Sequence, residues 1–195
     1  QITNNRAADK DHTSFDVRHR AVMSAIWDIP FGRGRMYGSS WSRPLDAILG
    51  GWTLTGIATF SSGTPILMTG PNRTGSPFVD HRPNRVCQGN LSNVDLRANL
   101  MYLDTSCFPL AAQGFFGTSS RAPLHGPGIN NWDTGIQKFF NFTEDMRLQF
   151  RAEMFNAFNH TQFGNPNSNA GAPNFGLVGG ARAPRLVQLA LRLLF

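Results

Sequence analysis

Apolar and polar side chains alternate along residues 146–158 and again along residues 185–195. Successive side chains of a β-strand point to opposite faces, so this alternation predicts two strands, each with one apolar and one more polar face. The apolar positions are Leu148, Phe150, Ala152 and Met154 in the first segment and Val187, Leu189, Leu191, Leu193 and Phe195 in the second. Whether these apolar faces contact a protein core or lipid decides the class of protein.

Three further segments alternate in the same way and predict strands near residues 16–29, 52–61 and 131–140. In the last of these, the alternation shifts at Lys138 and Phe139, where we expect a β-bulge. The sequence therefore predicts about five strands, each close to ten residues long.

The connections between these strands differ greatly in length and are rich in Gly, Pro, Asn and Ser, as turns and loops are. Residues 30–50 are expected to include a short helical turn, with Ser42 as its N-cap and Gly50 and Gly51 at its end. Residues 63–130 form a very long loop, 141–145 a tight turn, and 159–184 a second long loop.

The lengths of strands and connections favour lipid over a protein core. A β-sandwich has strands of about five or six residues with turns every 8–12 residues or so. Outer-membrane barrels instead have strands of about ten residues, with short turns at one end and long loops at the other. The 21 residues of the 30–50 connection (50 − 30 + 1 = 21) are longer than this pattern prefers.

The polar side of the strands also fits a barrel, because a barrel lumen is wet. The candidate lumen-facing polar residues are Arg18, Arg20, Arg147, Gln149, Arg151 and Glu153. Aromatic residues gather near the strand ends, where the two membrane interfaces would lie. These aromatic residues are Trp27, Phe31, Trp52, Phe60, Trp132, Phe140 and Phe195.

We therefore predict an all-β fold: an antiparallel, up-and-down segment of a transmembrane β-barrel, with about five long strands and long extracellular loops. Five strands cannot close a barrel, so both edges of the sheet would remain unpaired. The alternative is a secreted β-sandwich binding module for glycans or surface adhesion, which would turn the apolar strand faces inward.

Composition supports the membrane interpretation. Only 15% of the residues are charged, against about a quarter in a typical soluble domain. No apolar run reaches the roughly 18 residues of a membrane-spanning helix. The net charge is +6, but the arginines are scattered and form no basic cluster, so we expect no nucleic-acid partner.

Cys87 and Cys107, which are 107 − 87 = 20 positions apart, could form a disulfide in an oxidising compartment. The alternative is two unrelated thiols. We find no catalytic motif, no metal-binding spacing among the five histidines and no Cys-x-x-Cys pair. We therefore expect no enzyme activity, no metal site and no cofactor.

Several segments resemble the last barrel strands of TonB-dependent outer-membrane receptors, and especially the Oar-like group of that family. The resemblance covers nearly the whole chain, in the same order. The segments that carry it are FDVRHRAVMSAIWDIPFGRG (15–34), GGWTLTGIATFSSGTP (50–65), GPGINNWD (126–133), RLQFRAEMFNAFNHTQFGNPN (147–167) and the final RLVQLALRLLF (185–195).

The resemblance implies that residues 1–195 are the C-terminal part of a barrel of about 22 strands, whose plug domain is absent from this chain. The implied function is uptake of an unidentified solute across the bacterial outer membrane, with energy delivered by TonB. The implied partners are outer-membrane lipid and lipopolysaccharide, the rest of the barrel and the plug, TonB through the missing N-terminal region, and the barrel-assembly machinery.

The resemblance also implies an orientation. The last strand of these receptors ends at the periplasmic face, so residues 30–50 and 141–145 would be periplasmic, and residues 63–130 and 159–184 extracellular. The terminal aromatic residue and the alternating leucines before it resemble the signal read by the barrel-assembly machinery. In this chain the corresponding residues are Leu189, Leu191, Leu193 and Phe195.

Overall fold

The computed structural model describes residues 6–77, 80–91 and 95–195, and they form two compact units. The first, which we call the loop unit, comprises Gln1–Arg20, Ser61–Ile129 and Gln162–Arg182. The second, which we call the sheet unit, comprises Ala21–Phe60, Asn130–Thr161 and Ala183–Phe195. The chain therefore leaves and re-enters the sheet between its long strands, and the intervening segments fold together.

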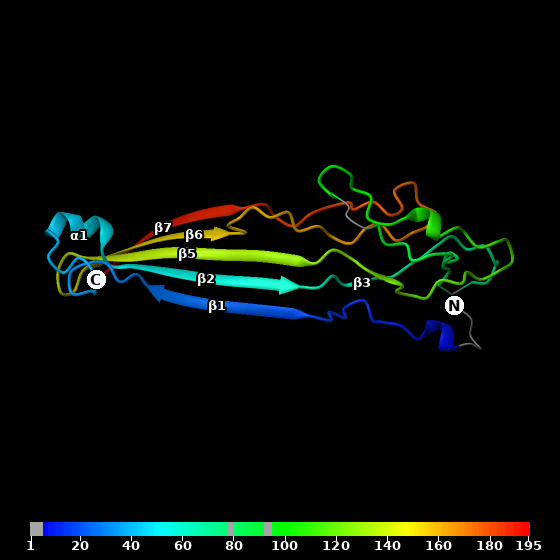
Figure 1. Cartoon of the computed structure of the whole chain (residues 1–195), viewed down its shortest axis with the longest axis horizontal. Coiled ribbons are helices and arrows are strands. Elements are labelled where there is room, and N and C mark those ends of the chain that lie inside the picture. Colours follow the sequence, from blue (N-terminus) through cyan, green and yellow to red (C-terminus); the bar gives the residue numbers. More distant parts are fainter. Residues whose placement is uncertain (1–5, 78–79, 92–94) are drawn as a thin grey trace. The chain divides into compact units, whose positions relative to one another are not determined.

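The main sheet has five strands in the order β1-β2-β5-β6-β7 (Figure 1). The strands are β1 (Arg20–Asp28), β2 (Trp52–Ser61), β5 (Ile129–Asn141), β6 (Arg147–Phe155) and β7 (Leu186–Leu194). Each strand lies beside its neighbour in sequence, and β6 pairs antiparallel with both β5 and β7. The strands form a single layer with β1 and β7 at its edges, so the predicted fold class, an up-and-down segment of an incomplete barrel, is confirmed.

The first and fourth strands are shorter than the alternation predicted. β1 begins at Arg20 rather than at residue 16, because β2 ends at Ser61 and leaves no strand beside residues 16–19. His19 instead exchanges hydrogen bonds with Ser62, at 2.8 and 3.1 Å. β6 ends at Phe155 rather than at residue 158, since Asn156 takes a left-handed φ of 50° that ends the extended backbone.

The third strand is regular, so the β-bulge expected at Lys138 and Phe139 is wrong. The register of β5 with β6 runs without interruption from Thr134 opposite Met154 to Asn141 opposite Arg147. Lys138 therefore keeps the alternation and lies on the same face as the apolar residues of β5. The alternation was misread because a lysine stands where an apolar residue was expected.

The 30–50 connection contains the expected short helix, α1 (Arg43–Leu49), which has Ser42 at its N-cap and Gly50 at its C-cap. The Ser42 side chain makes no capping hydrogen bond. Pro44 suits the first turn because the N–H that it lacks would have no partner there. None of the helices in the described part of the chain has the length and apolar character that crossing a membrane requires.

The loop unit has a hydrophobic core of its own. It contains a small sheet of β3 (Pro65–Ile66) and β4 (Leu124–His125), with 3-10 helices η1 (Arg6–Asp9) and η2 (Thr105–Cys107). Backbone bonds join distant segments, for example Met68 N–H to Arg121 O at 2.9 Å. The core side chains are Ile66, Met68, Leu103, Cys107, Phe108, Leu124 and Phe175. The long loops therefore fold into a packed structure.

Candidate functional site

One face of the main sheet is apolar; its side chains are half-buried on β5 and β6 and exposed on β7. The pairing of β5, β6 and β7 places opposite residues side by side, such as Phe150 between Lys138 and Leu191. The residues of this face on the three strands are Ile136, Phe140, Leu148, Phe150, Ala152, Met154, Val187, Leu189, Leu191 and Leu193. Leu189 and Leu191 are 67% and 70% exposed. A continuous row of exposed apolar side chains, such as that on β7, marks a surface that contacts lipid or another protein.

Aromatic side chains cluster at both ends of this face. At the end next to the long loops, the ring of Trp132 lies 5.7 Å from Phe60 and 5.8 Å from Phe158. At the other end, Trp52 lies 6.0 Å from Phe150. Trp52 and Phe60 are 60 − 52 = 8 positions apart on β2, or about 26 Å along the strand and about 20 Å along the axis of a barrel whose strands tilt by about 40°. Two aromatic girdles around an apolar band of about 25 Å are typical of outer-membrane barrels.

The opposite face carries the polar side chains of the same strands. Arg147, Gln149, Arg151 and Glu153 share this face of β6. Arg151 forms an ion pair with Glu153, and Gln149 Nε2 donates to Gln137 Oε1 at 3.2 Å. These contacts are those of a hydrated polar ladder, in which partly exposed charges satisfy one another.

The polar face continues across β1 and β2. The Thr53 hydroxyl donates to Asp28 Oδ1 at 2.7 Å, which places both side chains on this face. Arg20 lies on β1 with the same alternation as Asp28. A hollow of about 510 Å³ on this face is lined in part by Ser24, Thr55, Asp133 and Glu153. The apolar side chains of Ile26, Ile57 and Phe155 also line this open hollow, so the face is polar on β6 and mixed across β1 and β2.

Arg18 does not lie on this face, which corrects its assignment as a strand residue. It precedes β1 and belongs to the loop unit, where its guanidinium Nη2 lies 3.1 Å from His12 Nε2. The alternation alone could not show this, because it continues past the point where the neighbouring strand ends.

Lys138 is a charged residue of the apolar face whose role the alternation of side chains did not reveal. It stands on the apolar face but is only 4% exposed. Its ammonium group donates to the carbonyl oxygen of Asp46, in the last turn of α1, at 3.1 Å and to that of Gly50, the C-cap of the helix. The ammonium also lies 5.3 Å from the centre of the Trp52 ring and 5.1 Å from that of Phe140. The lysine therefore attaches α1 to the apolar face.

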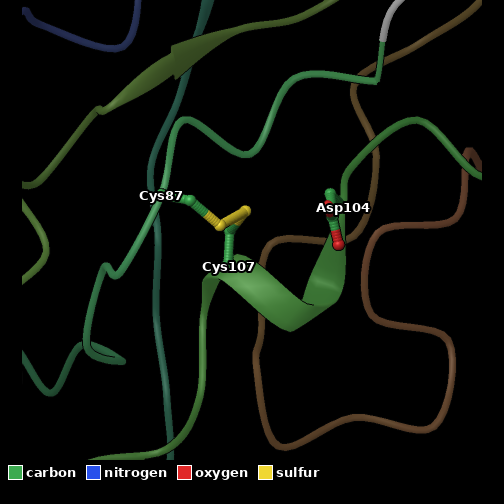
Figure 2. Close-up of side chains that lie close together, drawn as sticks. All are labelled: Cys87, Asp104 and Cys107. Atoms are coloured by element: carbon green, nitrogen blue, oxygen red, sulfur yellow. A yellow bond between two sulfur atoms is a disulfide. The ribbon is translucent and has the colours of Figure 1, made fainter.

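In the loop unit, Cys87 and Cys107 are joined by a disulfide, with 4.9 Å between their Cα atoms. Figure 2 shows Cys107 on η2 and Asp104 at the start of the same short helix. Asp104 accepts hydrogen bonds from the backbone N–H and the hydroxyl of Ser106. The three side chains lie close enough to suggest a metal site, but a disulfide offers no thiolate to a metal ion.

A second polar cluster of the loop unit consists of His125, His12 and Asp16. The ring of His125 lies 5.6 Å from that of His12, which contacts Asp16 at 2.9 Å. Burial lowers the pKa of His125, and the positive charge of Arg18 acts in the same direction. Asp11 accepts a hydrogen bond from the backbone N–H of Ala122 at 2.7 Å. This bond joins the segment before β1 to the segment before β4.

The residues proposed as an assembly signal lie at the edge of the sheet. Leu189, Leu191 and Leu193 line the apolar face of β7, and Phe195 follows the strand and is 98% exposed. The structure brings the leucines together with β6, while Phe195 extends beyond the paired residues.

Comparison with known proteins adds one match. A family model described as an outer membrane beta barrel domain matches residues 1–188. No curated protein and no solved structure gives a significant match.

Proposed function

The chain belongs to the outer membrane beta barrel family, and from that premise we propose that it forms the C-terminal barrel portion of a TonB-dependent transporter of the Oar-like group. The protein is located in the bacterial outer membrane. The alternative of a secreted β-sandwich module is therefore wrong, in agreement with the single-layered sheet, whose apolar face is exposed.

The observation that carries the proposal is the contrast between the two faces of the sheet. In a barrel wall, the face with Phe150, Leu189 and Leu191 contacts acyl chains, and the face with Arg151 and Glu153 lines the lumen. A lumen lined by charged and amide groups suits passage of a polar solute. The proposed role is transport without catalysis.

The lengths of the connections support a definite orientation. The five residues 142–146 between β5 and β6 and the connection that carries α1 lie at one end of the sheet, which we assign to the periplasm. The long connections, residues 63–130 and 159–184, are then assigned to the extracellular side, where loops contact lipopolysaccharide and arriving solute. The proposed partners are the rest of the barrel, a plug domain, TonB and the barrel-assembly machinery.

A conductance experiment separates a plugged transporter from an open pore. The full-length protein that contains this chain is inserted into a planar phospholipid bilayer. We expect almost no ion current from the intact protein, and a steady current after deletion of the domain that precedes the barrel. An open channel in the intact protein would overturn the transporter proposal and leave the outer-membrane barrel intact.

A cross-linking experiment tests the role of TonB directly. We expect the full-length protein to cross-link to TonB in cells, and its solute uptake to stop when a protonophore removes the energy of the inner membrane. Uptake that is unaffected by the protonophore would contradict the proposal.

A further inference from the structure

We propose that residues 30–51, with α1 at their centre, form a phospholipid-binding anchor that lies at the surface of the inner leaflet of the outer membrane. The proposal uses the orientation assigned above but does not depend on transport. It concerns the sheet unit alone, to which the whole segment belongs.

The segment that contains α1 is continuous with the apolar face of the sheet. α1 is attached to the apolar face of the sheet, because Lys138 extends from that face and donates hydrogen bonds to the carbonyl oxygens of Asp46 and of the C-cap Gly50. Trp52, on the same face, donates from its indole N–H to Ile48 O at 2.9 Å. A helix fixed at the aromatic girdle of a lipid-facing surface lies where the acyl chains meet the headgroups.

Large apolar side chains are exposed to solvent throughout this short segment. Met36 is 78% exposed and Ile48 is 67% exposed. The other exposed apolar residues of the segment are Phe31, Tyr37, Leu45 and Leu49. Contact with acyl chains removes such surface from water and is favourable by about 25 cal/mol per Å².

The segment also carries an excess of positively charged side chains. Arg33, Arg35 and Arg43 are exposed, and Asp46 is the segment's single carboxylate. Asp46 Oδ1 already accepts the backbone N–H of Arg33 at 2.7 Å. The segment therefore presents three guanidinium groups beside exposed apolar side chains, and guanidinium groups bind phosphate well. This combination suits phospholipid headgroups better than a protein surface.

Contacts within the segment order its backbone before any lipid binds. The rings of Phe31 and Trp41 are stacked 6.3 Å apart, and Gly51 N–H donates to Phe31 O at 3.1 Å. Gly32 packs so closely against Asp46 and Gly50 that a Cβ atom would lie 2.8 Å from Asp46 Oδ1. These contacts fix the backbone of the segment, so binding lipid requires no ordering of the backbone.

The test measures lipid contact at one position. The full-length protein with Ile48→Cys is labelled with a fluorophore and placed in vesicles of phosphatidylethanolamine and phosphatidylglycerol. Cys87 and Cys107 are joined in a disulfide and do not react, and any other cysteine of the full-length protein is replaced by serine. The control is Glu144→Cys, in the turn between β5 and β6 at the same end of the sheet. Nitroxide-labelled lipids report contact with the membrane, and iodide reports contact with water.

We expect the nitroxide lipids to quench the label at position 48 at least about threefold more than the label at position 144, with the reverse order for iodide. Equal quenching at both positions would overturn the proposal, because the segment would then lie in water. Protection of position 48 from both quenchers would also overturn it, because a protein would then cover the segment.

A second variant tests the arginines. In the protein with Arg33→Gln, Arg35→Gln and Arg43→Gln, nitroxide quenching at position 48 should no longer rise with the fraction of anionic phosphatidylglycerol. Retention of that dependence would show that the arginines do not bind phosphate and would overturn this part of the proposal. Neither measurement involves TonB, so a failure here is distinct from a failure of the transporter proposal.

Discussion

At the scale of single residues, Lys138 shows how one side chain can join a periodic strand to a segment outside the sheet. Its ammonium donates to the carbonyl oxygens of Asp46 in α1 and of Gly50 at the C-cap, and hydrogen bonds of a charged donor each contribute about 1.5–3 kcal/mol. We expect Lys138→Met to lower the free energy of unfolding by on the order of 2 kcal/mol and to speed hydrogen exchange in residues 43–51. Urea denaturation and exchange of the refolded full-length protein in detergent measure both quantities.

The matched controls are Lys138→Arg, which retains the charged donor, and Lys10→Met, which removes an exposed lysine. If Lys138→Met left the exchange of residues 43–51 unchanged, the attachment of α1 by this lysine would be refuted.

The disulfide of the loop unit gives a second prediction. Closing a loop of about 20 residues stabilises a fold by about 3 kcal/mol through the entropy of the unfolded chain. We expect Cys87→Ser with Cys107→Ser to make residues 80–125 more sensitive to protease added to intact cells, while the barrel strands stay resistant. Reduction of the wild-type protein should have the same effect, and unchanged cleavage in both would contradict the prediction.

His125 gives a prediction about pH. Burial lowers its pKa in the folded state, and Arg18 and His12 act in the same direction, while Asp16 and Asp11 oppose them. The unfolded chain takes up the proton at an ordinary value of about 6.5. The stability of the loop unit is therefore complete above that pH and falls as the pH drops toward the lower folded value.

We expect protease protection of residues 120–126 to weaken between about pH 7 and pH 5, and His125→Gln to reduce this dependence. The control is His81→Gln, elsewhere in the loop unit. An unaltered pH profile in His125→Gln would assign the effect to other groups.

At the scale of elements, the alternation of side chains predicted the strands well. Residues 52–61 form β2 as predicted. The errors have two causes. Residues 16–19 have the alternation but no strand beside them in the described part of the chain, and the left-handed backbone of Asn156 ends β6. Arg18 was misplaced for the same reason, and no local pattern could place Lys138 beneath α1. The core of the loop unit also depends on contacts between distant segments, which periodicity does not report.

The two faces of β7 give a prediction for this element. Leu189 lies on the apolar face opposite Ala152, in the middle of the strand, and Ala190 lies on the polar face opposite Arg151. We expect Leu189→Arg to destabilise the inserted barrel by about 2–4 kcal/mol, because the charge enters the hydrocarbon layer. Ala190→Arg places the same charge in the lumen, where water screens its repulsion from Arg151, and should cost less than about 1 kcal/mol.

Denaturant titration of the full-length protein in phospholipid vesicles measures this difference. If Ala190→Arg were the more damaging substitution, the assignment of lipid and lumen faces would have to be exchanged.

At the scale of the whole molecule, the five strands form only part of a barrel wall. β1 and β7 each have an edge without a neighbouring strand in the described sheet, and the apolar face remains exposed. Such edges and faces promote association between chains. We expect the 195-residue chain produced alone to aggregate in detergent-free buffer. Sedimentation that shows a folded monomer under these conditions would contradict this account of the sheet.

The order of the strands in the sheet has an evolutionary consequence. Within the main sheet, β1, β2, β5, β6 and β7 each pair with the next strand of that sheet along the chain, so the wall is built from successive hairpins. Gene duplication or loss of two successive strands would change the circumference of the barrel while leaving all other pairings in register. The same architecture can therefore give rise to pores of different widths by adding or removing hairpins, without redesign of the strands that remain.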